Sequence, residues 1–317
     1  MILTITPNPA VDRTAWVDEL RFDTVLRPRQ LIVLAGGKGV NVARAATTLG
    51  AEACTTGLVG GMSGRWFVEQ LQAEGLNPRF VELTAETRTT YTTVDRLARS
   101  VLVYEDGPEV GAEQVEDLLE LIDGQLARSD CSAAVVAGSM PGGAGGPIAA
   151  QVARRCLEQQ VLCIVDTTGE ALRQAAEARV AIVKVNAEEA AAAGFGGAMV
   201  AQQDWPDQGL ELARALVAAG AGAAVVTGGA QGAVAADGER AWVVQPASVD
   251  VVSTVGSGDA FAAGLAVATE QGRALPDGLA TAAAAGAANA AARGAGRFSL
   301  AHQRSLAAAV TVTEVAR

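Results

Sequence analysis

Short apolar runs alternate with longer helix-like stretches along most of the chain. The runs are rich in β-branched residues and are bounded by Gly or polar turns, which is typical of strands buried on both faces of a parallel sheet. The predicted strands are residues 2–6, 53–58, 133–137, 162–166, 181–185 and 223–227. The predicted helices are residues 38–49, 64–73, 112–123, 147–159, 187–193, 208–219, 259–271 and 275–292. This alternation predicts an α/β fold, with helices on both faces of a mainly parallel central sheet and right-handed crossovers.

Two segments, residues 12–34 and 87–104, depart from this alternation. They contain strand-like stretches, such as residues 90–94 and 101–104, without crossover helices. They predict a small antiparallel sheet, called the lid below, that stands off the main sheet. Because an exposed apolar sheet face needs a cover, we expect substrate or a second subunit on it. No repeat or linker divides the chain, so residues 1–317 are expected to form a single domain.

The charge and cysteine content narrow the class of protein. The formal net charge is −11, and no basic run is present, which argues against nucleic acid or a membrane as partner. Cys54, Cys131, Cys156 and Cys163 form no C-x-x-C pair, and nothing before the first strand resembles a signal peptide. We therefore expect reduced thiols in a cytoplasmic protein. The single histidine, His302, lies in a polar helical context, which argues against histidine catalysis and histidine-rich metal sites.

The turn before the predicted helix 259–271 carries the most informative chemistry. Gly256, Ser257 and Gly258 lead directly into Asp259 and an alanine-rich helix. The free N–H groups and the dipole of a helix N-terminus attract an anion, most often a phosphate. A carboxylate at that place suits a base that takes a proton from a hydroxyl while the N–H groups hold the phosphoryl group under attack. Capping alone explains the turn less well, because each glycine lowers helix propensity by about 1 kcal/mol. The pattern therefore indicates a small-molecule kinase.

A second glycine-rich turn opens the predicted helix 38–49. It is not a Walker A loop, because no Ser or Thr follows Lys38 and Ile32 stands where the first Gly would be. Gly37 permits close approach to the backbone, and Lys38 and Asn41 place a cation and an amide on the first helical turn. The alternative is a plain strand-to-helix turn.

Several polar residues follow predicted strands or lie in the predicted lid, where ligands of such folds bind. Asp12 can accept two sugar hydroxyls, or it is a solvated loop acid. Arg88 can bind an anionic group of the substrate, or it is a surface arginine. Glu189 can lie near a hydrated Mg²⁺, or it completes a capping box with Asn186. Lys184 can reach a phosphate, or it is an ordinary lysine at a strand end.

A third glycine-rich turn follows the predicted strand 223–227 and leads into another apolar run, residues 233–236. As a nucleotide loop it lets the backbone pass close to the phosphates and the ribose. The alternative is a simple strand-to-strand turn. The residues of this turn that we assign to nucleotide binding are Thr227, Gly228, Gly229 and Gly232.

Together these segments resemble the ribokinase-like (PfkB) carbohydrate kinase family. The resemblance rests on two signatures, residues 36–44 and 253–261, and on intervening motifs in the same order. Those motifs are residues 57–61, 138–141, 166–172 and 186–189. The resemblance implies a ribokinase-like three-layer sandwich with a β-sheet lid, and ATP-dependent phosphorylation of a sugar hydroxyl.

Residues 6–14, 87–89, 107–110 and 254–256 are most similar to the hexose-phosphate branch of that family, which includes 1-phosphofructokinase, tagatose-6-phosphate kinase and the minor 6-phosphofructokinase. The branch implies fructose 1-phosphate, fructose 6-phosphate or tagatose 6-phosphate as substrate and a homodimer formed through the lid. By this resemblance, Lys38 and Arg88 would bind the phosphate of the substrate, and Asp12 and Asn41 would bind the hydroxyls of the substrate. Asp259 would be the base.

The resemblance also assigns a nucleotide site. It implies that ATP binds with Mg²⁺ and that Glu189 contacts the metal through a water molecule. Ser139 and Gly37 would lie on the substrate side. The residues on the nucleotide side would be Lys184, Asn186, Asn289 and the turn 227–232. A ribokinase- or nucleoside-type kinase and a non-catalytic sugar-phosphate-binding module remain alternatives. A dinucleotide oxidoreductase is disfavoured, because residues 7–9 (Pro-Asn-Pro) follow the first strand in place of G-x-G-x-x-G.

Overall fold

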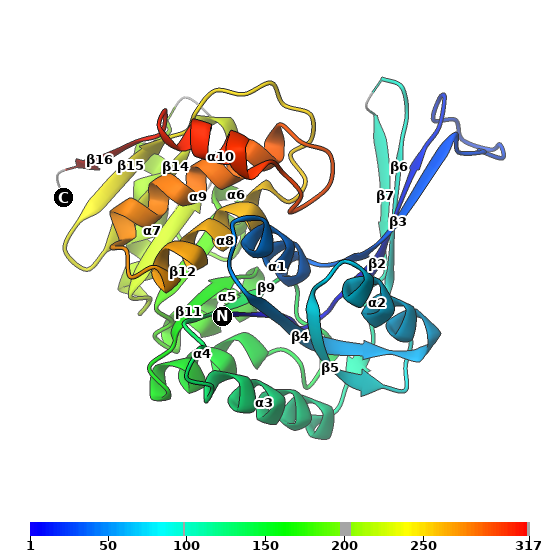
Figure 1. The fold of residues 1–317 in the computed structure, drawn as a ribbon, viewed down its shortest axis with the longest axis horizontal. Helices are drawn as coiled ribbons and strands as arrows, with labels where there is room; N and C mark the ends of the chain where they lie inside the picture. The colour runs from blue at the N-terminus through cyan, green and yellow to red at the C-terminus, as the bar shows by residue number, and fades with distance from the viewer. Residues whose placement is uncertain (98, 197–203, 316–317) are drawn as a thin grey trace.

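The computed structural model describes residues 1–97, 99–196 and 204–315. Residue 98, inside the second predicted lid segment, and the last two residues of the chain lie outside the described part. The described residues form a ten-stranded central sheet, a four-stranded lid and a two-stranded pair of β8 (Glu109–Val110) with β10 (Gly142–Gly143) (Figure 1). In spatial order, the central strands are β16 (Thr311–Val315), β15 (Ala241–Gln245), β14 (Ala233–Asp237), β13 (Ala223–Thr227), β12 (Ile182–Asn186), β11 (Leu162–Asp166), β9 (Ala133–Ala137), β1 (Ile2–Thr6), β4 (Ala53–Gly60) and β5 (Asn77–Leu83).

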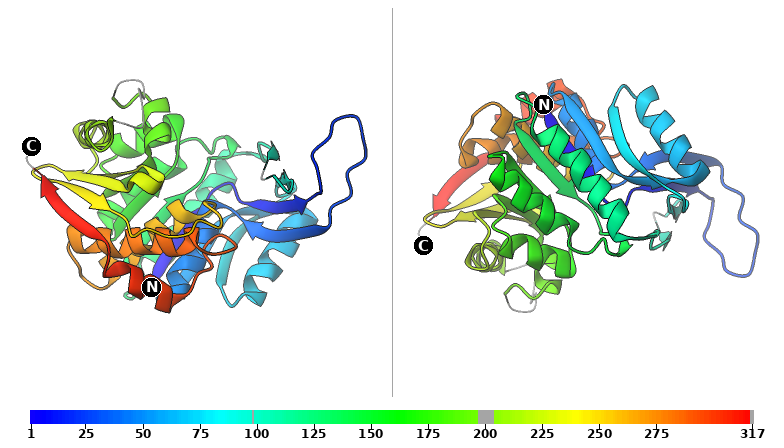
Figure 2. Two further views of the ribbon diagram at one scale, coloured as in Figure 1. Left: turned by 90° about the horizontal axis from the view of Figure 1, so that it is seen from above. Right: turned by 90° about the horizontal axis from the view of Figure 1, so that it is seen from below.

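Helices cover both faces of this sheet, as the views of Figures 1 and 2 show. One apolar core lies between the sheet and α1 (Lys38–Thr48), α2 (Gly61–Ala73), α8 (Ser257–Glu270) and α9 (Leu275–Ala290). The other lies beneath α3 (Ala112–Leu126), α4 (Ile148–Glu158), α5 (Gly169–Glu177), α6 (Ala187–Ala192) and α7 (Asp207–Ala218). A short helix, α10 (Leu300–Ala307), packs on α9. The predicted three-layer α/β arrangement is confirmed.

The predicted strands and helices are all present, with ends that differ by at most three residues. The alternation did not predict β5, β15, β16, α5 or α10, which are short or carry many polar residues. The strands β13, β14, β15 and β16 pair antiparallel with their neighbours in this order. On the other side of β13, the pairs from β13 through β12, β11, β9, β1 and β4 to β5 are all parallel. None of the described helices combines the length and apolar character needed to cross a bilayer.

The lid consists of β2 (Ala10–Trp16), β3 (Gln30–Gly36), β6 (Thr89–Val94) and β7 (Ser100–Tyr104), in the order β3-β2-β6-β7. It projects from the main body in Figure 1. The prediction of a purely antiparallel lid is wrong, because β2 and β6 pair parallel at its centre. The two strands leave the main sheet after β1 and β5, which point in the same direction, so they enter the lid in the same direction. Only the outer pairings, β2 with β3 and β6 with β7, are antiparallel.

Candidate active site

Five ionisable side chains, here called the charged cluster, gather where several central strands end: Lys38, Asp166, Lys184, Glu189 and Asp259. Asp166, the last residue of β11, lies at its centre and is fully buried. Its two carboxylate oxygens accept hydrogen bonds from Lys38 Nζ (2.8 Å) and Lys184 Nζ (2.5 Å). Burial alone would raise the pKa of Asp166, but the two ammonium groups outweigh it and lower the pKa to about 2.

Lys38 also donates to Glu189 Oε1 (2.9 Å), so its ammonium joins two carboxylates. Burial opposes this charge, while Asp166 and Glu189 raise the pKa of Lys38 well above its usual value. The Lys38 ammonium therefore lies between the end of β11 and the first turn of α6. An ammonium has three donors, so Lys38 can still offer one to a phosphate.

Asp259 lies in the first turn of α8 and is 6 % exposed. Its Oδ2 accepts a hydrogen bond from Asn41 Nδ2 (2.8 Å) on α1, so the two glycine-rich turns meet at this carboxylate. Burial, and next the negative charge of Asp166, raise the pKa of Asp259 to about 6 against the opposing effects of Asn41 and the lysines. The arrangement keeps a carboxylate of unusually high basicity at a helix N-terminus.

The turn before Asp259 depends on two glycines. Gly256 has φ = +80°, and a Cβ there would lie 2.5 Å from Ala295 Cβ. A Cβ on Gly258 would lie 2.8 Å from Lys184 Nζ, so that ammonium sits directly against the turn. The Ser257 N–H donates to Thr254 O (3.2 Å) and closes the turn, so it is the least available of the three predicted phosphate donors.

A second group of polar residues lies where the lid joins the main body. Arg88 is half-buried rather than a surface residue, and it donates to Glu105 O (3.0 Å), Asn8 O (3.0 Å) and Ser139 Oγ (3.4 Å). Asn8 Nδ2 donates to the same Ser139 Oγ (3.3 Å). Within the described residues, Arg88 Nε and Asn8 Oδ1 are buried and have no hydrogen-bond partner. Buried polar atoms without a partner are uncommon in folded proteins, and a bound ligand is one way to satisfy these two. Asn8 Nδ2 also donates to Asp106 O (2.9 Å).

Asp12 lies on β2, half-buried, and accepts a hydrogen bond from Thr90 Oγ1 (2.6 Å) on β6. The alternative of a solvated loop acid is therefore wrong. Burial raises the pKa of Asp12, and Arg44 and Arg88 oppose that rise. Gly37, the residue before α1, has φ = +119° and brings the backbone against Thr6.

The predicted nucleotide loop follows β13. Thr227 Oγ1 donates to Val185 O (3.3 Å), and residues Gly229–Gln231 form a 3₁₀ turn. The Trp205 ring lies against Gly228, and its Nε1 donates to Gln231 O (2.9 Å). The sequence did not predict Trp205 as part of the site, because Trp205 lies far from the loop along the chain and no motif connects the two. Gly232, with φ = +95°, returns the chain toward β14.

Asn186 and Glu189 form the capping box of α6. Glu189 N–H donates to Asn186 Oδ1 (2.7 Å), and Asn186 N–H donates to Glu189 Oε2 (3.1 Å). The capping interpretation is thus confirmed, while Glu189 Oε1 still faces Lys38. The described residues hold no group of three or more metal-ligating side chains. An Mg²⁺ ion near Glu189 would take most of its ligands from phosphates and water, which Mg²⁺ tolerates well.

Asn289 is buried on α9, and its amide is used by protein atoms. Its Nδ2 donates to Val255 O (2.9 Å) and Ser257 Oγ (3.2 Å), and its Oδ1 accepts from Gly296 N–H (2.8 Å). The amide braces the Gly256 turn from behind. This placement differs from the predicted direct contact with a nucleotide.

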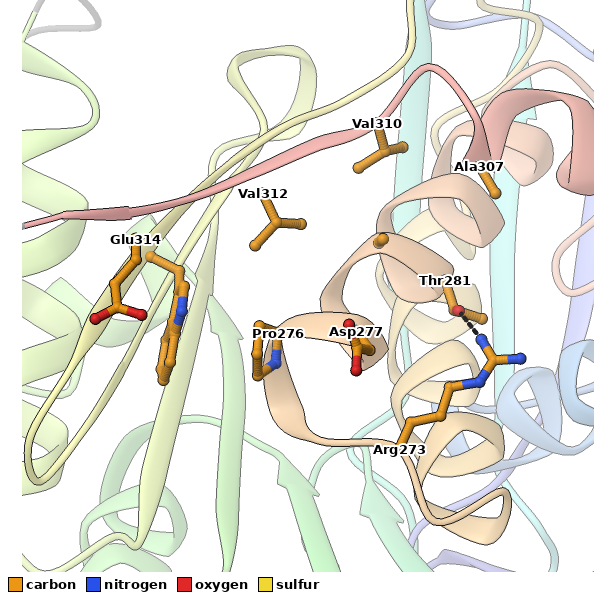
Figure 3. Close-up of a pocket in the computed structure, with 10 residues that line it drawn as sticks. Arg273, Pro276, Asp277, Thr281, Ala307, Val310, Val312 and Glu314 are labelled. Carbon is orange, nitrogen blue, oxygen red and sulfur yellow. Dashed lines mark hydrogen bonds between the residues drawn. The ribbon is translucent and has the colours of Figure 1, made fainter.

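Two cavities lie near these elements. A cavity of about 360 Å³ adjoins Ser139 and is bounded by Met140 and the first turns of α4 and α5. Figure 3 shows another, of about 770 Å³, between the first turn of α9 and strands β15 and β16. No residue of the charged cluster lines this cavity. Its Arg273 Nη1 donates a hydrogen bond to Thr281 Oγ1 (2.9 Å). The chemistry described above therefore lies outside the larger cavity.

Comparison with known proteins gives a consistent result. Residues 6–302 match the family model of the pfkB family carbohydrate kinases. A 1-phosphofructokinase of Haloferax volcanii is 34 % identical over 280 residues, which are 88 % of this chain and 87 % of that protein. A tagatose-6-phosphate kinase of Staphylococcus epidermidis is 28 % identical over 271 residues, 84 % of each chain. The crystal structure of phosphofructokinase-2 from Escherichia coli in complex with fructose-6-phosphate superposes with a TM-score of 0.84 at 25 % identity, covering 97 % of this chain and 98 % of that one.

Proposed function

Because the chain belongs to the pfkB family of carbohydrate kinases, we propose that it transfers the terminal phosphoryl group of ATP to a hydroxyl of a ketohexose phosphate. The relatives named 1-phosphofructokinase and tagatose-6-phosphate kinase support a hexose phosphate as acceptor. The observation that carries the proposal is the buried Asp259 carboxylate at the N-terminus of α8, with Lys184 against the same turn. Reduced, unpaired cysteines are consistent with a cytoplasmic enzyme.

Asp259 acts as the general base that takes the proton of the attacking hydroxyl. The N-terminus of α8 and the Lys184 ammonium stabilise negative charge on the phosphoryl group in transfer. ATP extends from this turn toward the loop 227–232. Mg²⁺, held by the nucleotide phosphates and by Glu189 through water, would supply further charge neutralisation when bound. Asn186 contributes by fixing the Glu189 carboxylate, and Asn289 by bracing the Gly256 turn.

The acceptor lies between the lid and the main body. Asp12 and Asn41 bind its hydroxyls, and Arg88 with Ser139 binds its existing phosphate, with Lys38 offering its remaining donor. Gly37 lets the sugar approach the backbone. A panel of ketohexose phosphates, free sugars and nucleosides, scored by ADP release, tests the proposal. Turnover of free sugars or nucleosides in preference to phosphates would favour a ribokinase-type activity, and ligand binding without ADP release would favour a binding module.

The change Arg88→Ala is expected to raise KM for the sugar phosphate by about 10- to 100-fold, because hydrogen bonds to a charged group contribute about 1.5–3 kcal/mol. KM for an unphosphorylated analogue should change little. Steady-state kinetics with both acceptors measure the difference. Arg13→Ala, an exposed arginine on the same lid, is the control. Equal increases for both acceptors would remove the phosphate-binding role.

The pH dependence of kcat is expected to follow the ionisation of Asp259. Its base form is required, and its pKa is raised to about 6, so kcat is expected to fall about tenfold per unit below pH 6. The second ionisation of a phosphate also lies near pH 6 and would change KM, so kcat at saturation is the quantity to follow between pH 5 and 8. An acidic limb near pH 4 would mean that Asp259 titrates as an ordinary carboxyl or is not the base.

We also propose that the lid pairs with the lid of a second copy. Its edge strand β7 exposes Val101, Leu102, Val103 and Tyr104, with exposed fractions of 42–58 %, and an edge strand offers unpaired backbone groups. Light scattering should give the mass of a dimer, and the double change of Leu102 and Val103 to Lys should give a monomer. Leu157→Lys, at an exposed leucine of α4, is the control. A monomeric wild type would exclude this pairing.

A further inference from the structure

Arg44 is a buried arginine of α1 to which no role in the reaction has been given. It is 6 % exposed, and its whole guanidinium is engaged. Nε and Nη2 donate to the two oxygens of Glu74 (2.5 and 3.0 Å), and Nη2 also donates to Ala35 O (2.5 Å). Nη1 donates to Asn41 Oδ1 (3.0 Å), one helical turn away on the same face. Because the planar guanidinium of Arg44 donates to Glu74, Ala35 and Asn41, its orientation is fixed.

This orientation decides how the Asn41 amide points. A guanidinium can only donate, so the amide must turn its oxygen toward Arg44. Its Nδ2 then faces Asp259 and donates to Oδ2 (2.8 Å). The opposite orientation would place two donors against each other at Arg44 and two acceptors against each other at Asp259. Arg44 and the Asp259 carboxylate therefore favour the same orientation of the Asn41 amide, and Arg44 holds the amide from the far side.

We propose that Arg44, held in place by Glu74, is a positioning residue that acts through Asn41 on the Asp259 carboxylate. The inference rests on the proposed function only in taking Asp259 as the base. By holding Oδ2, Asn41 leaves Oδ1 to receive the proton of the acceptor hydroxyl. Ala35 lies at the root of lid strand β3 and Glu74 at the end of α2, so Arg44 ties both elements to the base.

The charged groups on both sides of this chain of contacts are known. Lys38, Lys184 and Asp166 face Asp259. Glu74 faces Arg44 and also accepts from Arg297 (3.2 Å), and the positive charge of Arg44 also lowers the pKa of Asp12. Arg297 thus shares Glu74 with Arg44, and no hydrogen bond or ion pair joins it to Asn41 within the described residues. It is a matched control for loss of a positive charge beside Glu74.

The test is the change Arg44→Met, followed by kcat against pH at saturating substrates. Without Arg44 only the Asp259 carboxylate orients the Asn41 amide, so the hydrogen bond that favours the charged form of Asp259 is held less firmly. The acidic limb of the plot of kcat against pH should move up by about one pH unit, so kcat should fall about fivefold at pH 6 and about tenfold well below it, with KM for ATP unchanged. Arg297→Ala should leave the limb in place. Arg44→Lys, which keeps the charge but not the fork, should shift it as Arg44→Met does.

A double-variant cycle separates positioning from general damage. In an Asn41→Ala background, Arg44→Met should move the limb no further, because the mediator is already gone. An unshifted acidic limb in Arg44→Met, or additive shifts in the double variant, would overturn the proposal.

NMR titration of the Asp259 carboxyl carbon, assigned with D259N, gives the same comparison without turnover. An inactive wild type would therefore count against the kinase proposal alone, while an unchanged Asp259 titration in Arg44→Lys would count against Arg44. If Arg44→Met does not fold, Arg44→Lys and the NMR titration decide.

Discussion

Replacing Asp259 with Asn is expected to lower kcat by about 10²–10⁴-fold, the contribution of a well-placed general base. The amide nearly matches the carboxylate in shape and can still accept the Asn41 hydrogen bond, but it cannot take up the proton of the attacking hydroxyl. ATP binding should remain close to that of the wild type, since the N–H groups of the turn and Lys184 are unchanged. Initial rates of ADP release and calorimetric titration with ATP measure the two quantities.

Asp277→Asn is the matched control for this change. Asp277 lies in the first turn of α9, as Asp259 does in α8, but it is exposed and lines the cavity of Figure 3 rather than the charged cluster. Its kcat should equal that of the wild type. If D259N turned over at the wild-type rate, another group would have to accept the proton, and the proposed mechanism would be wrong.

Replacing Asp166 with Ala is expected to destabilise the fold by about 3–5 kcal/mol, because it leaves a buried ammonium without its counter-ion. Lys184 is 3 % exposed and Asp166 is the carboxylate that joins it to Lys38. Urea unfolding followed by circular dichroism measures the change. The double change of Asp166 to Ala and Lys184 to Met should recover part of the loss, because no unpaired charge is then buried. If both variants lose the same stability, the lost packing of Asp166 and not the orphaned Lys184 charge is the cause.

The pH dependence of stability provides a second check on Asp166. Its folded-state pKa is lowered from 3.8 to about 2, so its contribution is fully present above about pH 4. That contribution is lost as the pH falls toward 2, where the folded carboxyl also takes up a proton. The acid-induced loss of stability over this window should be smaller in Asp166→Ala than in the wild type. Glu170→Ala removes an exposed pair with Arg173 and should leave the neutral-pH stability unchanged.

Local patterns along the chain were sufficient to predict most strands of the central sheet and most of its helices, but not β5, β15 or β16. Each buried parallel strand is an apolar run that ends in Gly or polar residues, so its position can be read without knowledge of its neighbours. The glycines around Asp259 likewise indicated an anion site, because the backbone conformation of such a turn is a local property. The parallel pairing at the centre of the lid could not be read in this way, since it depends on where β2 and β6 leave the main sheet.

The sequence by itself determined most of the helices and strands, the two glycine-rich turns and the candidate base. Only the tertiary structure decided that Asp166 joins Lys38 to Lys184, that Ser139 and Asn8 meet Arg88, and that Arg44 orients Asn41. The physical reason is that the spacing of apolar, glycine and capping residues acts over a few positions. Charge pairing and hydrogen-bond direction depend instead on partners such as Lys38 and Asp166, which lie far apart in the chain and meet only when the strands are ordered in the sheet.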